Sequence, residues 1–499
     1  MSPFVSLLSS VDPRPDARLS ERAQLSQIDA SVCGPAVLFV VSALNWLLGG
    51  LVVGLLAAVK LHVPELPGVA GWIYNCEFLT YGRLVPAYQT MLTYGWGNNM
   101  VFAAGLWIMA RLCGAQVKHL GMLYVAGGVW NTGVLWGVLS ILLGGPTSVP
   151  GLEMPMGVGP VLGCSYLLIA VWAILCFQYR QPGPVYVSQW YMLAALFWFP
   201  WIYFAGEMMA LWAPARGTVQ ALASGWFTQN AYALWYTPAA LAAIYYCLPK
   251  VLGKPIRHYY LSALGFVVLA GFSPWTGAVN LIYGPVPVWT QTVSIVASVV
   301  LILPLLVTAI NFHQTAWDGA RDVWRSPTLR FVVFGALSFT VAGAVGVVTS
   351  LRSVNVVTHF TQFAVAHEVH AFYAFFTMTM FGVIYFMLPR LLQRDWPSAL
   401  LIEAHFWLSA LGVGMLLTVL YLGGWTQGVE MNDASVPFID VVKHLLPMDV
   451  LRTLAGLLML GGLGAFLINV GLLVASGVLS LACELLMLDP AAPAEEGGR

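Results

Sequence analysis

Residues 33–60 read CGPAVLFVVSALNWLLGGLVVGLLAAVK and contain a single charged side chain, Lys60, at the very end of the run. About 20 consecutive apolar residues suffice for a helix to cross the hydrocarbon core of a bilayer, so this stretch predicts a transmembrane helix. Eleven similar runs follow, and together they predict an all-α membrane protein built as a twelve-transmembrane-helix bundle. The predicted spans are 33–60, 83–112, 119–144, 158–180, 187–213, 223–250, 259–282, 290–314, 329–350, 361–389, 400–422 and 452–481.

The overall composition agrees with this reading. The 499 residues are 59% hydrophobic and only 8% charged, whereas a soluble domain carries about 25% charged residues. The chain therefore cannot supply the polar shell of a soluble enzyme, and its net charge of zero gives no basic tract for nucleic acid. Its seven cysteines show no CxxC spacing and are predicted to be small apolar core residues. No nucleotide-binding glycine loop, Ser/His/Asp set or HExxH motif is present in the sequence.

The distribution of positive charge predicts the topology. With both termini in the cytoplasm, 15 of the 21 lysines and arginines fall on the inner side, as the positive-inside rule requires. The predicted organisation is a cytoplasmic N-terminal segment (1–32), one membrane domain (33–482) and a disordered cytoplasmic tail (483–499). The outer loops 64–78, 145–157 and 423–447 are rich in Trp, Pro and Gly. Such loops could cap a cofactor or dock a partner, or they could simply belt the membrane interface with aromatic side chains.

Polar side chains at membrane depth are costly, so each is a candidate functional residue. The densest set lies in VNVVTHFTQFAVAHEVH (354–370), which carries His359, His367, Glu368 and His370. His367 and His370 are three residues apart and therefore share one helical face, whereas Glu368 points away from it. The two histidines could bind one metal, or one could be a heme ligand and the other a hydrogen-bonding residue. Glu368 needs a partner, because a buried unpaired carboxylate would take up a proton.

The remaining histidines give weaker signals. His405 opens the predicted span 400–422, and His313 ends the span 290–314. Four others fall in predicted loops and are expected to face solvent or the membrane interface: His62, His119, His258 and His444.

Several short motifs carry a resemblance that covers residues 35 to about 480. They include Tyr81-Gly-Arg-Leu-Val-Pro86, Tyr186-Val-Ser-Gln-Trp-Tyr191, Ile244-Tyr-Tyr-Cys-Leu-Pro-Lys250, Thr358-His-Phe-Thr361 and Thr426-Gln-Gly428. With these motifs the chain resembles subunit I of the C-type, or cbb(3)-type, heme–copper oxygen reductases, which also have twelve helices with both ends inside. The resemblance implies the inner membrane of a bacterium.

The catalytic positions depart from that family. The resemblance implies a low-spin heme held by two histidines, whose positions here are Tyr88 and Val369. It implies a copper ion held by three histidines, whose positions here are Gln229, Val279 and Asn280, and a redox tyrosine at the position of Ser273. Gln, Val and Asn cannot replace three imidazoles around copper. His367 alone matches, as the proximal ligand of the high-spin heme, so the chain is identified as a divergent member that lacks most metal ligands.

Three hypotheses follow. In the first, the protein is a divergent subunit I that binds at most one heme b through His367, has no copper site or low-spin heme, and contacts a membrane-anchored c-type cytochrome over its outer face. His359 and His405 then resemble family residues near the heme propionates and the outer cap, with Arg352 nearby. The open side of the heme, near Gln229, Ser273 and Asn280, would accept a diatomic gas such as nitric oxide.

In the second hypothesis the protein is an active terminal oxidase or nitric oxide reductase with rearranged ligands, which Glu368, His370 and His313 would have to supply. In the third it is a cofactor-free membrane scaffold or assembly subunit, a pseudoenzyme in which His367 is kept for packing. A secondary transporter is disfavoured, because the sequence shows no convincing internal repeat.

Overall fold

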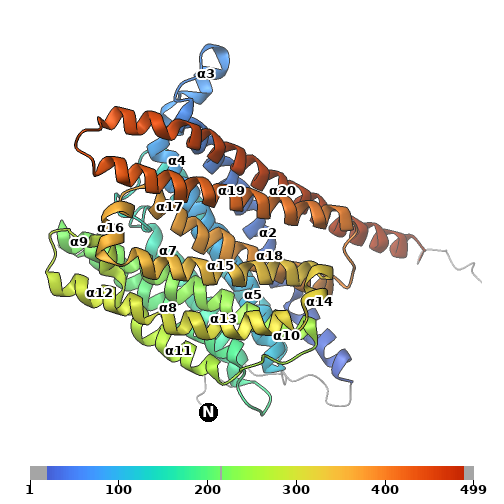
Figure 1. Ribbon diagram of the computed structural model, residues 1–499. Coiled ribbons are helices and arrows are strands. Elements are labelled where there is room, and N and C mark those ends of the chain that lie inside the picture. Colours follow the sequence, from blue (N-terminus) through green and yellow to red (C-terminus); the bar gives the residue numbers. More distant parts are fainter. Residues whose placement is uncertain (1–19, 214–215, 488–499) are drawn as a thin grey trace, which may run out of the picture.

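The computed structural model describes residues 20–213 and 216–487, and over these residues the chain is helical, with no strand. Figure 1 shows the helices packed side by side as one bundle. The long helical segments are α2 (Glu21–His62), α4–η2–α5 (Tyr81–Thr90, Met91–Gly97, Asn98–Cys113), α6 (Leu120–Leu142), α7 (Val158–Gln178), α8–η3 (Val187–Glu207, Met208–Trp212), α9–η4–α10 (Thr218–Ala231, Tyr232–Tyr236, Thr237–Leu252), α11–η5–η6 (Leu261–Phe272, Ser273–Trp275, Gly277–Leu281), α12–α13 (Val288–Val300, Ile302–Trp317), α15 (Pro327–Thr349), α17–η7–α18 (Gln362–Val369, His370–Thr377, Met378–Leu392), α19 (Ala399–Met431) and α20 (Phe438–Met487). Four short helices lie between them: α3 (Gly68–Tyr74), η1 (Glu77–Leu79), α14 (Ala320–Arg325) and α16 (Arg352–Thr358).

Each predicted membrane span coincides with one of these long segments, so the predicted all-α bundle is confirmed. Ten segments of the described chain are long and apolar enough to cross a membrane. The other two are α4–η2–α5 and α9–η4–α10, which are continuous helices of mixed composition. They carry Asn98, Asn99 and Asn230, which are fully buried among other helices. Their lower hydropathy therefore reflects polar side chains that face the interior of the bundle.

Three predicted boundaries need correction. The first helix begins at Glu21, where Ser20 caps it, so its start lies inside the predicted N-terminal segment 1–32. The predicted loop 423–447 is mostly helical, because α19 continues to Met431 and α20 begins at Phe438. The predicted tail 483–499 is helical as far as Met487. Residues 1–19 and 488–499 lie outside the described residues. In each case a helix continues past the apolar run that predicted it.

The segment α17–η7–α18 forms the centre of the bundle. Within its most apolar window 94% of the residues are buried, against 33–44% in the other nine candidate spans. Two glycines of α19 contact the start of α17 and the preceding short helix α16. A Cβ atom on Gly424 would lie 2.0 Å from the backbone nitrogen of Phe363, and one on Gly428 would lie 1.7 Å from the carbonyl oxygen of Val357. Only glycine allows the two backbones to approach so closely.

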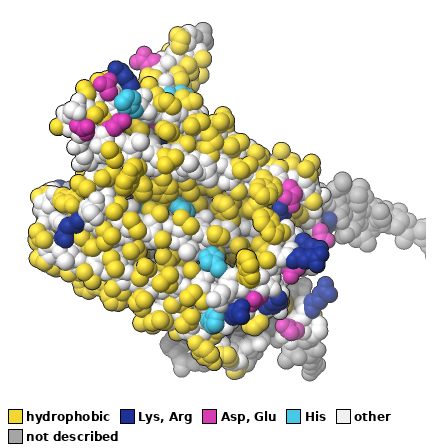
Figure 2. Space-filling view, viewed as in Figure 1, with side chains coloured by type: hydrophobic (Ala, Val, Ile, Leu, Met, Phe, Trp, Pro, Cys, Tyr) yellow, Lys and Arg dark blue, Asp and Glu magenta, His cyan; other side chains and the backbone are white. Residues whose placement is uncertain are grey.

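The outer surface of the bundle is apolar over much of its area. Figure 2 shows hydrophobic side chains spread across the visible face, with several Lys and Arg side chains gathered at its right-hand end. Large apolar side chains such as Trp201, Val267 and Leu411 are more than half exposed along the helices. This surface suits contact with lipid tails, as expected for a multi-pass membrane protein.

The loop at 143–157 folds back onto one end of the bundle. The Tyr94 hydroxyl donates to the carbonyl oxygen of Gly151 at 2.8 Å, and Ser224 donates to that of Pro150 at 3.2 Å. Glu153 accepts from the Gly151 nitrogen at 2.8 Å, and its burial raises the pKa of its carboxyl group. This predicted outer loop therefore caps the interior of the bundle.

A buried ion pair ties α2 to α5 near the opposite end. Asp29 accepts from Arg111 Nε at 2.7 Å and from Trp107 Nε1 at 2.9 Å, and a second contact joins the other carboxylate oxygen to Arg111 Nη2. Both side chains are less than a tenth exposed. A bidentate pair of this kind fixes the geometry of the two helices.

Replacement of Asp29 by alanine is expected to destabilise the protein by about 3–5 kcal/mol, because it leaves Arg111 buried without its counter-ion. The expected result is a large drop in the thermal unfolding midpoint of the detergent-solubilised protein. The double variant Asp29→Leu/Arg111→Met removes both charges and should recover most of that loss. An unchanged midpoint for Asp29→Ala would contradict this account.

Candidate functional site

Three helices that carry predicted site positions each change to a π-helical turn at the same offset. Tyr88 lies three residues before η2, Gln229 three residues before η4, and His367 three residues before η7. A π-helical turn widens the helix and is frequent at functional sites. These turns alter the direction of the following side chains, so that Tyr232 and Phe372 also face the interior.

A first cavity, the His367 cavity, lies among α9, η6, α15 and α17 and has a volume of about 220 Å³. It brings together His367, Gln229, Val279 and Asn280, which are separated by up to 138 positions in the sequence. The residues that define it are Gln229, Tyr232, Val279, Asn280, Thr349, His367 and Ala371. The structure thus places the proximal histidine and the three predicted copper positions around one space.

The imidazole of His367 has a ring nitrogen that no group of the described chain engages. Its Nδ1 is buried and has no hydrogen-bond partner among the described residues. Its ring lies against Gly346 of α15, where an added Cβ would come within 3.1 Å of Cε1 and 3.3 Å of Nε2. An imidazole with an unpartnered nitrogen at the wall of a cavity is a group that can ligate heme iron.

The same cavity does not fit a copper ion. Gln229 and Asn280 offer amide groups and Val279 offers none, and the described residues contain no group of three His, Cys, Asp or Glu side chains that could hold a metal. Ser273, at the position of the redox tyrosine, is fully buried on η5 and is not among the residues that line the cavity. Copper sites in proteins use imidazole or thiolate ligands, and none of the three predicted copper positions offers one.

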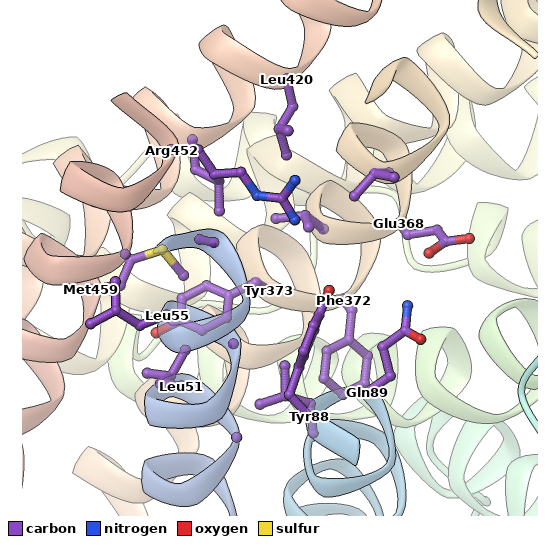
Figure 3. A pocket seen from close by; sticks show the side chains of 18 of the residues that line it. Leu51, Leu55, Tyr88, Gln89, Glu368, Phe372, Tyr373, Leu420, Arg452 and Met459 are labelled. Carbon is purple, nitrogen blue, oxygen red and sulfur yellow. The ribbon is translucent and has the colours of Figure 1, made fainter. Parts of the chain in front are cut away.

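A second cavity, the Tyr88 cavity, has a volume of about 130 Å³ and lies among α2, α4, α17, α19 and α20 (Figure 3). Tyr88 and Val369, the two predicted low-spin heme positions, both line it. Its other walls are mostly apolar and include Leu51, Leu55, Leu416, Leu420, Phe372 and Met459. In Figure 3 the Tyr88 hydroxyl is directed toward the Arg452 guanidinium. The cavity presents no imidazole, so its residues do not fit a bis-histidine heme.

Glu368 forms part of the wall between the two cavities. It lines the Tyr88 cavity together with Arg452 and lines the His367 cavity together with Gln229 and Asn280. No hydrogen bond or ion pair of its carboxylate is present in the part of the chain that the structure describes. Tyr232 also borders both spaces. Sequence reasoning missed Tyr232 and Gly346, although Tyr232 lies one turn after Gln229.

The other candidate histidines divide into two groups. His359 lies at the outer side of the His367 cavity, where its ring stacks on Phe360 with a centroid distance of 3.9 Å. His370 instead faces α19, where its Nδ1 lies 3.1 Å from the Tyr421 hydroxyl, and His313 Nε2 lies 2.9 Å from Thr340 Oγ1. Arg352 donates to Thr292 at 3.0 Å. Of these residues, the structure brings only His359 to a cavity.

His405 lies apart from both cavities in an aromatic cluster. Its ring centroid is 4.4 Å from that of Phe381 and 4.6 Å from that of Phe466, and its Nδ1 lies 2.9 Å from the Tyr385 hydroxyl. The side chain is fully buried near the start of α19. The structure therefore does not join His405 to His367, and its contacts indicate a packing role.

The model of the family described as cytochrome C and quinol oxidase polypeptide I matches residues 34–458. The chain belongs to this family. Among its relatives are a cytochrome c oxidase subunit 1 homolog of Azorhizobium caulinodans, 26% identical over 84% of this chain and 78% of that protein, and the cbb3-type cytochrome c oxidase subunit CcoN1 of Stutzerimonas stutzeri, 23% identical over 85% and 91%.

A solved heme–copper terminal oxidase dimer has the same fold as this subunit I homologue, with a TM-score of 0.70 over 92% of this chain and 84% of that chain. The sequence identity of 14% makes this a likeness of fold alone. The resemblance to the heme–copper oxidase family, including its cbb3-type members, is thereby confirmed. This likeness of fold does not by itself assign any heme or metal to a residue of this chain.

Replacement of His405 by phenylalanine is expected to lower stability by about 1–3 kcal/mol, because the buried Tyr385 hydroxyl loses its partner. Heme absorbance per mole of protein should stay at the wild-type level. The double variant Tyr385→Phe/His405→Phe removes both partners and should regain part of the lost stability. Loss of bound heme from His405→Phe, with the fold intact, would instead make His405 a cofactor ligand.

Proposed function

We propose that this heme–copper oxidase subunit I homologue holds one heme b through His367 and has neither the copper centre nor the low-spin heme. The observation that carries the proposal is the imidazole of His367, whose buried Nδ1 has no partner, at the wall of a cavity that Gln229, Val279 and Asn280 also line. The protein would serve as a multi-pass subunit of a redox complex in a bacterial inner membrane, with both termini in the cytoplasm.

A heme iron held by a single imidazole supplies an open coordination position for a small gas such as nitric oxide. The side chains opposite His367 suit this use, because the Gln229 and Asn280 amides offer hydrogen-bond donors and Val279 keeps one side apolar. Glu368, at the wall of the same cavity, provides a titratable carboxyl group within the membrane. Reduction of oxygen to water by four electrons is not part of the proposal, since the copper ligands and the tyrosine are missing.

The outer end of the molecule supports the proposed contact with a membrane-anchored c-type cytochrome. The short helix α3 protrudes there (Figure 1), and its Trp72 and Ile73 are 85% and 65% exposed. Aromatic and aliphatic side chains exposed to this degree are typical of protein interfaces. The cytochrome would approach the side on which loop 143–157 caps the bundle.

The two alternative hypotheses make different demands on the site. An active oxidase or nitric oxide reductase with rearranged ligands would need Glu368, His370 and His313 to converge. Of these three, Glu368 alone lines a cavity, while the two histidines bond to Tyr421 and Thr340. A cofactor-free scaffold would retain the fold without binding any heme.

The decisive measurement is a reduced-minus-oxidised optical spectrum of the purified protein with metal analysis. We expect one b-type heme per chain, no stoichiometric copper, and loss of the heme from His367→Ala. His370→Ala is the matched control and should keep its heme, because His370 lies outside both cavities. Absence of heme from the wild type would favour the scaffold, and copper with oxygen uptake would favour the rearranged enzyme. A low-spin bis-histidine signal would show that the assignments of Tyr88 and Val369 are wrong.

Replacement of Gly346 by alanine should disturb heme binding although the proposed ligand His367 is itself unchanged. The new Cβ would lie 3.1 Å from His367 Cε1, so the ring must move. We expect a reduced heme content or a shifted Soret band at a near-normal unfolding midpoint. Gly414→Ala is the control, because no atom lies within 4 Å of its added Cβ. Identical heme spectra for the two variants would argue against a heme on His367.

A further inference from the structure

A third cavity, the basic cavity, opens at the end of the bundle opposite the loop 143–157. It has a volume of about 630 Å³ and lies among the N-terminal part of α2 and the C-terminal ends of α5, α10 and α18. Five cationic side chains line it, with two carboxylates: Arg22, Arg111, Lys250, Arg390, Arg394, Asp29 and Asp395. All five cations belong to the set that the sequence predicts to be cytoplasmic. Figure 2 shows Lys and Arg side chains gathered at this end.

The carboxylates do not neutralise this charge. Asp29 is fully engaged by Arg111 through two contacts. Arg390 stacks on the Phe386 ring, 3.6 Å from its centroid, and donates to the Phe386 carbonyl oxygen at 2.6 Å. The side chains of Arg22, Lys250 and Arg394 form no hydrogen bond or ion pair within the described chain. The cavity therefore presents several cationic groups whose hydrogen bonds are unused.

Helix termini account for only part of the positive charge. The C-terminal ends of α5, α10 and α18 each carry about half a negative elementary charge, which attracts Arg111, Lys250 and Arg390. The N-terminal end of α2 carries about half a positive charge of its own. Five cations, two carboxylates and these four helix ends leave the cavity with a net charge of about +2. Attraction between the cations and the helix ends therefore does not account for all of the positive charge in the cavity.

We infer that the basic cavity binds a phosphate-bearing anion, held by Arg22, Lys250, Arg390 and Arg394. Arginine donates two parallel hydrogen bonds to phosphate oxygens, and the volume of the cavity exceeds that of a single phosphate group. Pro389 and Phe386 add apolar surface to the wall of the cavity. Basic pockets between transmembrane helices on the cytoplasmic side suit anionic lipid head groups, and a soluble phosphate compound has the same recognition chemistry. The inference does not depend on the heme proposal.

The test uses the full-length protein and a triple variant, Arg22→Gln/Lys250→Gln/Arg394→Gln, whose changed side chains are not part of the Asp29–Arg111 pair. Three probes are added to delipidated protein: phosphatidylglycerol, phosphatidylcholine and ATP. Binding is measured by native mass spectrometry and by the shift of the unfolding midpoint. We expect phosphatidylglycerol to bind the wild type, and the triple variant to bind it on the order of 100-fold more weakly, about fivefold for each cation removed.

The matched control is Arg180→Gln/Arg321→Gln/Arg325→Gln, which removes three predicted cytoplasmic cations that do not line the cavity. It should bind phosphatidylglycerol as the wild type does. Binding of ATP that only the cavity variant loses would also support the site and would assign a soluble source to the phosphate. Equal loss of binding in both triple variants, or no preference for either phosphate anion over phosphatidylcholine, would overturn the inference.

Discussion

The enclosure of α17–η7–α18 by the other helices is the constraint on which the rest of the structure depends. A membrane offers no water to polar side chains, so His367 and Glu368 of α17 are tolerable only where other helices surround them. Gly424 of α19 lets α17 pack closely at its start, Gly428 does the same for the preceding α16, and Gly346 leaves room for the His367 ring. Both site cavities lie against this one helix, on different sides of Glu368.

The fold of this subunit I homologue does not require the metal ligands whose absence we propose. The bundle of a heme–copper oxidase subunit I depends on apolar packing and on close contacts at glycine, and these need no metal ligand. The side chains that project into the two cavities are free to differ as long as they do not clash. Tyr88 and Val369 therefore line the Tyr88 cavity without a clash with the packing around them. The outer cap and the basic cavity lie at opposite ends and are independent of that change.

The sequence predicted the helices well and the site only in part. Apolar runs identified all twelve long segments, because transfer into lipid is set by local composition. Helix ends were less predictable: α2 starts with the polar turn at Glu21, and α19 continues to Met431, since helical hydrogen bonding does not stop where the lipid ends. The convergence of Gln229, Val279, Asn280 and His367 was expected from the family resemblance. The positions of Tyr232 and Gly346 were not, because no local pattern marks a side chain that borders a cavity.

By itself, the sequence determined that this is a multi-pass helical membrane protein of the oxidase subunit I family, since hydropathy and short motifs are properties of contiguous residues. Only the tertiary structure decided which polar residues share a space. It separated His405 and His370 from His367 and placed Glu368 between two cavities. It also gathered five cations at one end, four from four helices and Arg394 from just beyond α18. Helices that lie far apart in the chain contribute to each of these sites, and their rotation and π-helical turns set where each side chain points. Those are consequences of packing, which local sequence does not specify.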